Sequence, residues 1–275
     1  MIEIDGSLGE GGGQVLRSSL TLSMMTGQDV QITNIRAKRQ KPGLRPQHLN
    51  AVQVAAEICV ANVEGANIGS QEITFYPGEI QGGKYRYDID TAGSTSLVLQ
   101  TVLLPLSKAA QSSTVTIIGG THVPWSPCFH YLDLHYLPFL WKMGLDVHLR
   151  MEQVGFYPRG GGQIRATIDP KEQLLPLNLI ERGRLIEIRG ISAVANLARN
   201  IATRQRRQVL GRLGRRYPLN DIRVLDLPAS SPGSLILLLA EFEKSQACYF
   251  ALGEKGKSAD KVADDAIAAF EAFMA

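Results

Sequence analysis

The chain carries an internal repeat with a period of about 80 residues, and this repeat limits its possible folds more than any other feature. The VQIT run at Val30 resembles VTII at Val115, at an offset of 85 residues, and the FYP tripeptide at Phe75 returns 81 residues later. HLNAV at His48 resembles HYLDL at His130, at an offset of 82. Each match alone could be a coincidental strand or turn pattern, but matches in one order at nearly one offset indicate a duplicated unit.

Each copy has the pattern of a strand, a helix, a strand, a second helix and a closing hairpin, or βαβαββ. The expected elements are strands 2–5 and 85–89, helices 14–25 and 97–109, strands 30–35 and 114–118, and helices 47–61 and 131–143. The second helix of the first copy is supported by apolar residues at helical spacing, namely Leu49, Val52, Ala56, Cys59 and Val60. Such units bury one face of a sheet under two helices, so we expect an α/β (α+β) fold.

The repeat ends near Arg182, so we expect residues 1–182 to form a repeated domain of two units and residues 183–275 a smaller α/β domain. The second part reads as several strands around a basic helix at 199–216. It closes with an amphipathic helix in which Val262, Ala266 and Phe270 share one face and Ser258 is the N-cap. This smaller domain has the pattern of an insertion into the repeat architecture.

Charge and cysteine usage exclude several classes of protein. A net charge of +3 is too small to indicate a nucleic-acid partner, so any such partner must be inferred from local clusters of charge. Cys59, Cys128 and Cys248 lie far apart, which argues against a disulfide framework or a zinc site and favours a reducing compartment. No leader pattern starts the sequence, and the longest aliphatic run, at 235–240, is too short to span a bilayer. We therefore expect a cytoplasmic protein without membrane contact.

A glycine run at residues 9–13 lies between the first strand and the first helix. Glycine allows an oxygen-rich ligand to approach the backbone amides, and the helix N-terminus adds partial positive charge. Glu10 could hold Mg²⁺ on a bound phosphate, and Gln14 and Arg17 share the helix face beside the turn. The run lacks the Walker and dinucleotide patterns, so a simple turn remains an alternative. The second run, GGGQ at Gly160, lies between strand-like segments and is expected to be a hairpin or a bulge.

The loop before the second helix carries five cations and no acid, namely Arg36, Lys38, Arg39, Lys41 and Arg45. It is either a solvated loop or a site for a polyphosphate or an RNA 3′ end. His48, next to Gln47 at the start of the helix, is the histidine that we expect to face a ligand. The arginines of 199–216 could hold an RNA backbone or could form a solvated helix face. The other histidines show no tight metal-ligand spacing.

Four segments together resemble the RNA 3′-terminal phosphate cyclases. They are DGSLGEGGGQVLRSSLTLSMMTG from Asp5, IRAKRQKPGLRPQHL from Ile35, TAGSTSLVLQTVLLPL from Thr91 and GFYPRGGGQI from Gly155, in the order and spacing of that family. The resemblance implies three or four βαβαββ units, with a smaller thioredoxin-like domain inserted before the last one.

The resemblance also implies an ATP-dependent reaction on RNA that ends in a 3′-phosphate. A family histidine takes AMP from ATP, AMP passes to the RNA 3′-phosphate, and the neighbouring 2′-hydroxyl closes a 2′,3′-cyclic phosphate and releases AMP. By this resemblance Glu10 would bind Mg²⁺ or Mn²⁺. The residues implied to hold phosphates or the RNA end are Arg17, Arg36, Arg39 and His48, and those implied to contact the nucleotide are Gln14, Gln47, Gln100 and Pro127.

The adenylated histidine of the family lies in the unit after the inserted domain, whereas no histidine follows His148 in this sequence. We therefore expect the chain to be a truncated or split form, or a member that binds without catalysing. A homodimer or a C-terminal partner segment is expected to cover the surface left exposed. A non-catalytic RNA-binding relative of the ribosome-assembly type is the alternative function. An enolpyruvyl transferase on a related repeat fold is a third, disfavoured by the paired GEGGGQ and RPQHL motifs.

Overall fold

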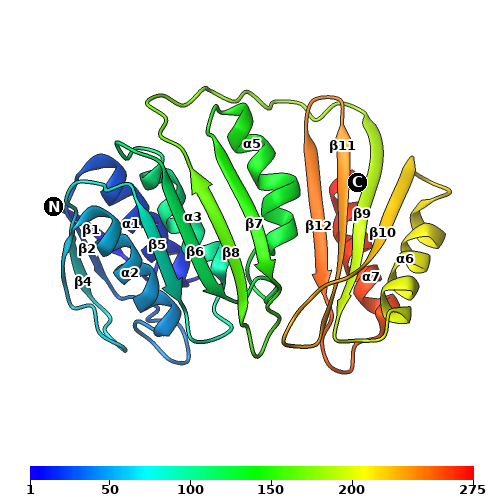
Figure 1. Ribbon diagram of the computed structural model, residues 1–275, viewed down its shortest axis with the longest axis horizontal. Coiled ribbons are helices and arrows are strands. Elements are labelled where there is room, and N and C mark those ends of the chain that lie inside the picture. Colours follow the sequence, from blue (N-terminus) through cyan, green and yellow to red (C-terminus); the bar gives the residue numbers. More distant parts are fainter.

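The computed structural model describes residues 1–275 and consists of three four-stranded sheets that lie side by side, with helices packed on them (Figure 1). The first unit contains β1 (Ile2–Asp5), α1 (Gly13–Thr26), β2 (Val30–Thr33), α2 (Pro46–Cys59), β3 (Asn62–Glu64) and β4 (Ile73–Tyr76). The second unit contains β5 (Lys84–Asp88), α3 (Thr95–Leu106), β6 (Ser113–Gly119), α4 (Phe129–Tyr131), η1 (Leu132–Tyr136), α5 (Leu137–Lys142), β7 (Val147–Gln153) and β8 (Gly162–Ile168). The α/β fold class predicted from the repeat is confirmed.

The sheets of the two units have the same strand order, β1-β2-β4-β3 in the first and β5-β6-β8-β7 in the second. In each sheet the first two strands are parallel and the other pairs are antiparallel. This is the topology expected of a duplicated βαβαββ unit.

The two units share one hydrophobic core. Leu20 and Ile32 of the first unit and Leu103 and Ile117 of the second belong to a single cluster of buried side chains. The hydroxyl of Thr21 on α1 also donates a hydrogen bond to the carbonyl of Thr101 on α3, at 2.9 Å. Because the helices of both units pack against each other, the loops that precede α1, α2 and α3 are held in fixed relative positions.

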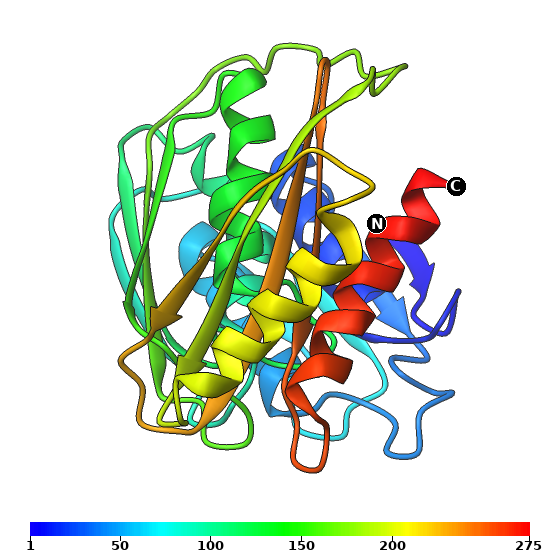
Figure 2. The ribbon, with the colours of Figure 1, turned by 90° about the vertical axis from the view of Figure 1, so that its right-hand side faces the viewer.

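The remaining residues form a third sheet with its own core. Its elements are β9 (Leu185–Ala195), α6 (Asn200–Leu213), β10 (Leu219–Asp226), β11 (Gly233–Phe242), β12 (Gln246–Leu252) and α7 (Ala259–Met274), with strand order β10-β9-β11-β12. Helices α6 and α7 pack side by side on this sheet (Figure 2). The Ser258 side chain accepts a hydrogen bond from the Lys261 amide at 3.2 Å, so the predicted N-cap of the last helix is confirmed.

Two local expectations were wrong, and a third feature differs in detail. Val60 does not belong to the buried face of α2, because it adopts a left-handed conformation after the helix and is 70% exposed. The helix expected over 131–143 starts at Phe129 and contains a π-helical turn at Leu132–Tyr136. The basic stretch at 199–216, expected either to hold an RNA backbone or to form a solvated face, is partly neutralised. Acids of neighbouring elements pair with Arg199, Arg204, Arg206, Arg212 and Arg216.

The carboxyl ends of most parallel strands meet at one edge of the molecule, the lower edge in Figure 1. The β1–α1, β2–α2, β5–α3, β7–β8 and β12–α7 loops all lie along it. Ligands of α/β proteins bind at such edges. None of the helices combines the length and apolar character that a membrane crossing requires.

Candidate functional site

The site begins at Gly13, the first residue of α1, where the backbone of the β1–α1 loop passes very close to two side chains. A Cβ at this position would lie 2.5 Å from Nε2 of His48 and 2.7 Å from Nη1 of Arg17. Only glycine therefore allows α1 to start against these two groups. No acid occupies the first turn of α1, and its N-cap, Gly12, provides no side-chain acceptor. The amides of this N-terminus remain available to an anion.

Arg17 is a buried guanidinium without a carboxylate partner. It is 8% exposed, and one of its terminal nitrogens, Nη2, donates to Oε1 of Gln14 at 2.9 Å. Its Nε is buried with no hydrogen-bond partner. Burial lowers the pKa of Arg17 to about 10, which leaves it charged at neutral pH. A buried cation that lacks a counter-ion is costly for the fold, and an anionic ligand would remove that cost.

His48 is a neutral hydrogen-bond donor directed at the same point. Its Nδ1 accepts the Arg45 amide at 3.2 Å, so the ring proton is on Nε2, the atom that faces Gly13 and Arg17. Burial, together with the charges of Arg36, Arg17 and Arg45, lowers the pKa of His48 to about 3. The imidazole is therefore uncharged over the physiological range, and its Nε2–H can donate to a phosphate oxygen.

Glu10 and Arg39 form the open side of the site. Their closest atoms, Oε2 and Nη2, lie 3.7 Å apart, and the Glu10 side chain is 95% exposed. A Cβ on Gly12 would lie 3.3 Å from the same Arg39 nitrogen, and one on Gly11 would lie 3.5 Å from the Lys38 side chain. The tip of the cationic loop, with Lys38 and Arg39, thus lies over the glycine run.

Arg36 and Gln47 are placed differently from the residues above. Nη1 of Arg36 donates to the carbonyls of Lys41 and Gly43, both at 2.8 Å, so part of this guanidinium stabilises its own loop. Gln47 is exposed at the start of α2. Its Cβ lies 3.5 Å from the position of a Cβ on Gly93, so it connects the first unit to the β5–α3 loop of the second.

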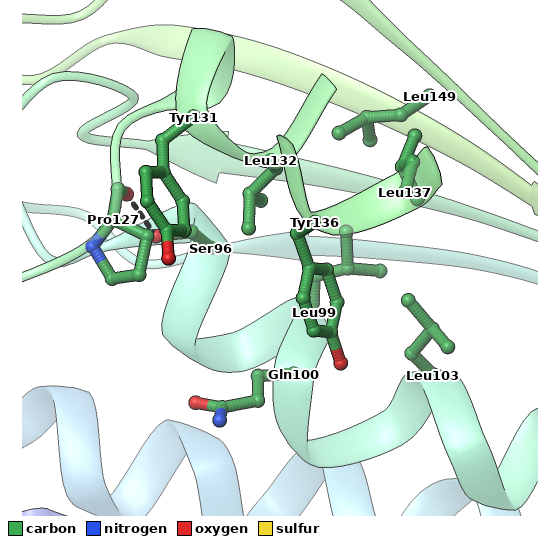
Figure 3. A pocket seen from close by; sticks show the side chains of 10 residues that line it. All are labelled: Ser96, Leu99, Gln100, Leu103, Pro127, Tyr131, Leu132, Tyr136, Leu137 and Leu149. Atoms are coloured by element: carbon green, nitrogen blue, oxygen red, sulfur yellow. Dashed lines mark hydrogen bonds between the residues drawn. The ribbon is translucent and has the colours of Figure 1, made fainter. Parts of the chain in front are cut away.

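Gln100 and Pro127 lie together in a cavity of about 210 Å³ between α3 and the α4–η1 segment (Figure 3). The hydroxyl of Ser96 donates to the Pro127 carbonyl at 2.6 Å and fixes the loop above α3. Tyr131, at the end of α4, and Tyr136, at the end of η1, extend toward α3 (Figure 3). Apolar walls with a few polar groups are typical of a site for a flat ring.

The sequence named the glycine run and included Lys38 among the loop cations, but it did not show why position 13 in particular requires glycine. It missed the two tyrosines, because Tyr131 and Tyr136 read as ordinary residues of an amphipathic helix. The sequence predicted that most of the other histidines are packed or solvated, and His122 and His130 are packed. Nε2 of His122 and Nδ1 of His130 lie 2.9 Å apart in a buried pair whose pKa values burial lowers.

No group of three or more His, Cys, Asp or Glu side chains comes together to hold a metal ion. Glu10 is the carboxylate of the β1–α1 loop, and it is exposed. Mg²⁺ commonly binds through one or two carboxylates together with substrate phosphates and water. The arrangement therefore fits a cation that arrives with a phosphate ligand and does not fit a protein-enclosed metal site.

Comparison with known proteins gives one consistent family. A family model described as RNA 3′-terminal phosphate cyclase matches residues 8–274. A relative from Pseudomonas fluorescens named RNA 3′-terminal phosphate cyclase is 46% identical over 97% of this chain and 77% of its own length. Relatives with the same name from Ralstonia nicotianae and Archaeoglobus fulgidus are 47% and 45% identical, over 95% and 97% of this chain and 75% and 79% of their own lengths.

Proposed function

Because the chain belongs to the RNA 3′-terminal phosphate cyclase family, we propose that its loop edge binds ATP and an RNA 3′-phosphate and closes the RNA end to a 2′,3′-cyclic phosphate. Overall, the RNA 3′-phosphate and ATP give the 2′,3′-cyclic phosphate, AMP and pyrophosphate. The atoms of water lost on ring closure end up in AMP and pyrophosphate. The similar relatives carry the cyclase name, so the alternative of a non-catalytic ribosome-assembly protein is not favoured.

The observation that carries this proposal is the buried, uncompensated Arg17 at the start of α1. The Arg17 guanidinium, the Nε2–H of His48 and the free amides of α1 converge on one point beside Gly13. A phosphate there would receive charge-assisted hydrogen bonds in a partly dry environment, where such bonds are strongest. Developing charge on a phosphoryl group in a transition state would be stabilised in the same way.

The remaining residues divide between the two substrates. We assign Arg39 and Arg36 to phosphate oxygens at the open side, and Gln47 to the RNA end, because it lies where the two units meet. The cavity with Gln100 and Pro127 would take the adenine ring of ATP. A magnesium or manganese ion carried by the phosphates would contact Glu10, and its chemistry there is charge neutralisation.

We propose that the nucleotide is not attached covalently to a histidine within these 275 residues. His48 is the histidine among the arginines, but its Nε2 carries the proton and its Nδ1 is engaged by the Arg45 amide. A nucleophile needs a free lone pair near the reacting atom. The chain's own residues therefore bind, orient and stabilise charge. Three free cysteines support a reducing cytoplasm as the compartment.

The test uses Arg17→Met, which keeps an unbranched, flexible side chain and removes the guanidinium and its charge. Calorimetry with ATP·Mg²⁺ and with an oligoribonucleotide that ends in a 3′-phosphate should show a loss of binding of at least tenfold. The ligand-free variant should melt no lower than the wild type, because a buried cation without a partner has been removed. Arg150→Met, at an exposed arginine of β7, is the matched control and should bind normally. Unchanged binding by Arg17→Met would refute the proposal.

A further inference from the structure

A second, larger cavity lies where the third sheet meets the loops of the second unit. It has a volume of about 800 Å³. Phe156, Tyr157 and Pro158 of the β7–β8 loop form one wall, and the N-terminal ends of α6 and α7 form the other. Neither the family resemblance nor the residues assigned above give this cavity a role.

The cavity wall carries one positive charge that no acid pairs, that of Lys255. Its charged residues are Arg204, Lys255, Lys257 and Glu254. Lys255 is exposed and makes no ion pair, whereas Arg204 pairs with Asp260 and Lys257 pairs with Asp265. Helices α6 and α7 run side by side, and both begin at this wall (Figure 2). The first turn of α6 has no acid and no side-chain cap, so its amides add to the positive potential.

The cavity also exposes apolar surface that can receive bases. The Tyr157 side chain is 65% exposed and Leu197 is 39% exposed on the opposite wall. Flat apolar and aromatic groups beside cations are the combination that binds single-stranded nucleic acid without reading its sequence, since bases stack and phosphates pair with lysine or arginine.

Short contacts connect this cavity to the phosphate site along the same edge of the molecule. From Gln47 the surface continues to Gly93, whose Cβ position is 3.5 Å from the Gln47 side chain. A Cβ on Gly160 would lie 2.8 Å from Ala92, and one on Gly161 would lie 3.2 Å from Oγ of Ser230. The glycines thus allow the loops between the two sites to pack closely together.

We propose that this junction cavity binds the single-stranded RNA segment immediately 5′ of the terminal phosphate. The inference rests on the proposed function, because it assumes that the RNA end is held beside Gln47 and Arg39. The cavity volume falls within the range of ligand sites of about 300–1,000 Å³, which suits a short segment of RNA and not a duplex. The third sheet then contributes to RNA binding, and the RNA backbone passes over the second glycine run.

The experiment measures binding of oligoribonucleotides that end in a 3′-phosphate, one and eight nucleotides long, by competition against a labelled eight-mer. The variants are Lys255→Glu and Tyr157→Ala, and the matched control is Lys171→Glu. Lys171 is also exposed and unpaired, but it follows β8 at the opposite edge, where its amide contacts the Ser107 carbonyl. Wild-type protein should bind the eight-mer at least tenfold more tightly than the mononucleotide.

Lys255→Glu and Tyr157→Ala should each weaken eight-mer binding about tenfold and leave mononucleotide binding unchanged. Lys255→Glu should also reduce the slope of log affinity against log salt by about 0.7, the value for one phosphate contact on a single strand. Length-independent affinity in the wild type, or equal effects of Lys255→Glu and Lys171→Glu, would overturn the inference while leaving the terminal site intact. If an eight-mer with a 3′-hydroxyl binds as tightly as the 3′-phosphate, the proposed function fails instead.

Discussion

Gly13→Ala is the substitution that tests most directly how the site is built. An added Cβ would lie 2.5 Å and 2.6 Å from two ring atoms of His48 and 2.7 Å from Nη1 of Arg17. Carbon and nitrogen atoms need about 3.5 Å, so these groups must move by about 1 Å. Neither is free to do so, because the ring is fixed by the Arg45 amide and the guanidinium by Gln14.

Two opposing effects set the size of the change in stability. Alanine in place of glycine in the first turn of α1 gains up to about 1 kcal/mol of helix propensity, whereas overpacking a buried contact costs about 1–3 kcal/mol. The free energy of unfolding should therefore fall by about 0–2 kcal/mol. Ligand binding should suffer more, since a displacement of about 1 Å at a site of this kind can cost about a hundredfold.

The assay is the rise in thermal midpoint on addition of ATP·Mg²⁺ and of a 3′-phosphorylated oligoribonucleotide. A ligand at a hundred times its Kd stabilises the folded state by about 2.7 kcal/mol, and a hundredfold loss of affinity would remove most of that. Gly12→Ala is the control, because its Cβ meets only the mobile tip of Arg39, at 3.3 Å, and its φ of −94° suits alanine. If Gly13→Ala gives the same ligand-induced shift in thermal midpoint as Gly12→Ala, the contact of Gly13 with His48 and Arg17 is not needed for ligand binding.

Three further predictions concern the residues around this point. Glu10→Gln should abolish the Mg²⁺-dependent part of the ATP-induced thermal shift without lowering ligand-free stability, because the Glu10 side chain is 95% exposed. Gln100→Ala should weaken ATP about fivefold, as expected for one lost hydrogen bond, and leave inorganic triphosphate unaffected in calorimetry; equal losses for both ligands would argue against a base pocket. With a folded-state pKa of about 3, below the unfolded value of 6.5, His48 contributes stability that is fully present above pH 6.5 and is lost as the pH falls toward 3. His48→Asn should thus remove about 2 kcal/mol of the decrease in unfolding free energy between pH 7 and pH 5 in urea titrations; an unchanged decrease would contradict this account of His48.

The sequence predicted the duplicated unit well because its signal is local and repeated. Strand 2–5 and the helices at 14–25 and 47–61 were found within two residues of their observed ends. The identical strand order of the two sheets explains why similar patterns recur at nearly one offset. Val60 was misplaced because apolar spacing cannot reveal that the backbone turns left-handed at the end of α2. The π-helical turn is equally invisible to a search for helical periodicity.

Contacts between distant parts of the chain were harder to predict from the sequence. The acid-free stretch at 199–216 gave no indication that Asp221, Asp226, Asp260, Asp264 and Glu271 would neutralise most of its arginines, since these acids come from β10 and α7. The opposite holds for Arg17, which the sequence marked as a lone cation in an apolar helix. The sequence predicts that Arg17 has no partner on its own helix, because no acid lies three or four positions away from it. The structure places no acid beside it from other elements either.

The two glycine runs show how one tetrapeptide serves two physical purposes. In the first, Gly13 has an ordinary helical position and is required because side chains of α1 and α2 occupy the space of its Cβ. In the second, Gly160 and Gly161 have φ values of 66° and 68° in the turn before β8, so the backbone itself requires glycine. The predicted hairpin turn is confirmed for the second run. Substitution by alanine should therefore impair ligand binding in the first run and the geometry of the turn in the second. The second run also borders the junction cavity, so its distortion should affect long RNA more than a mononucleotide.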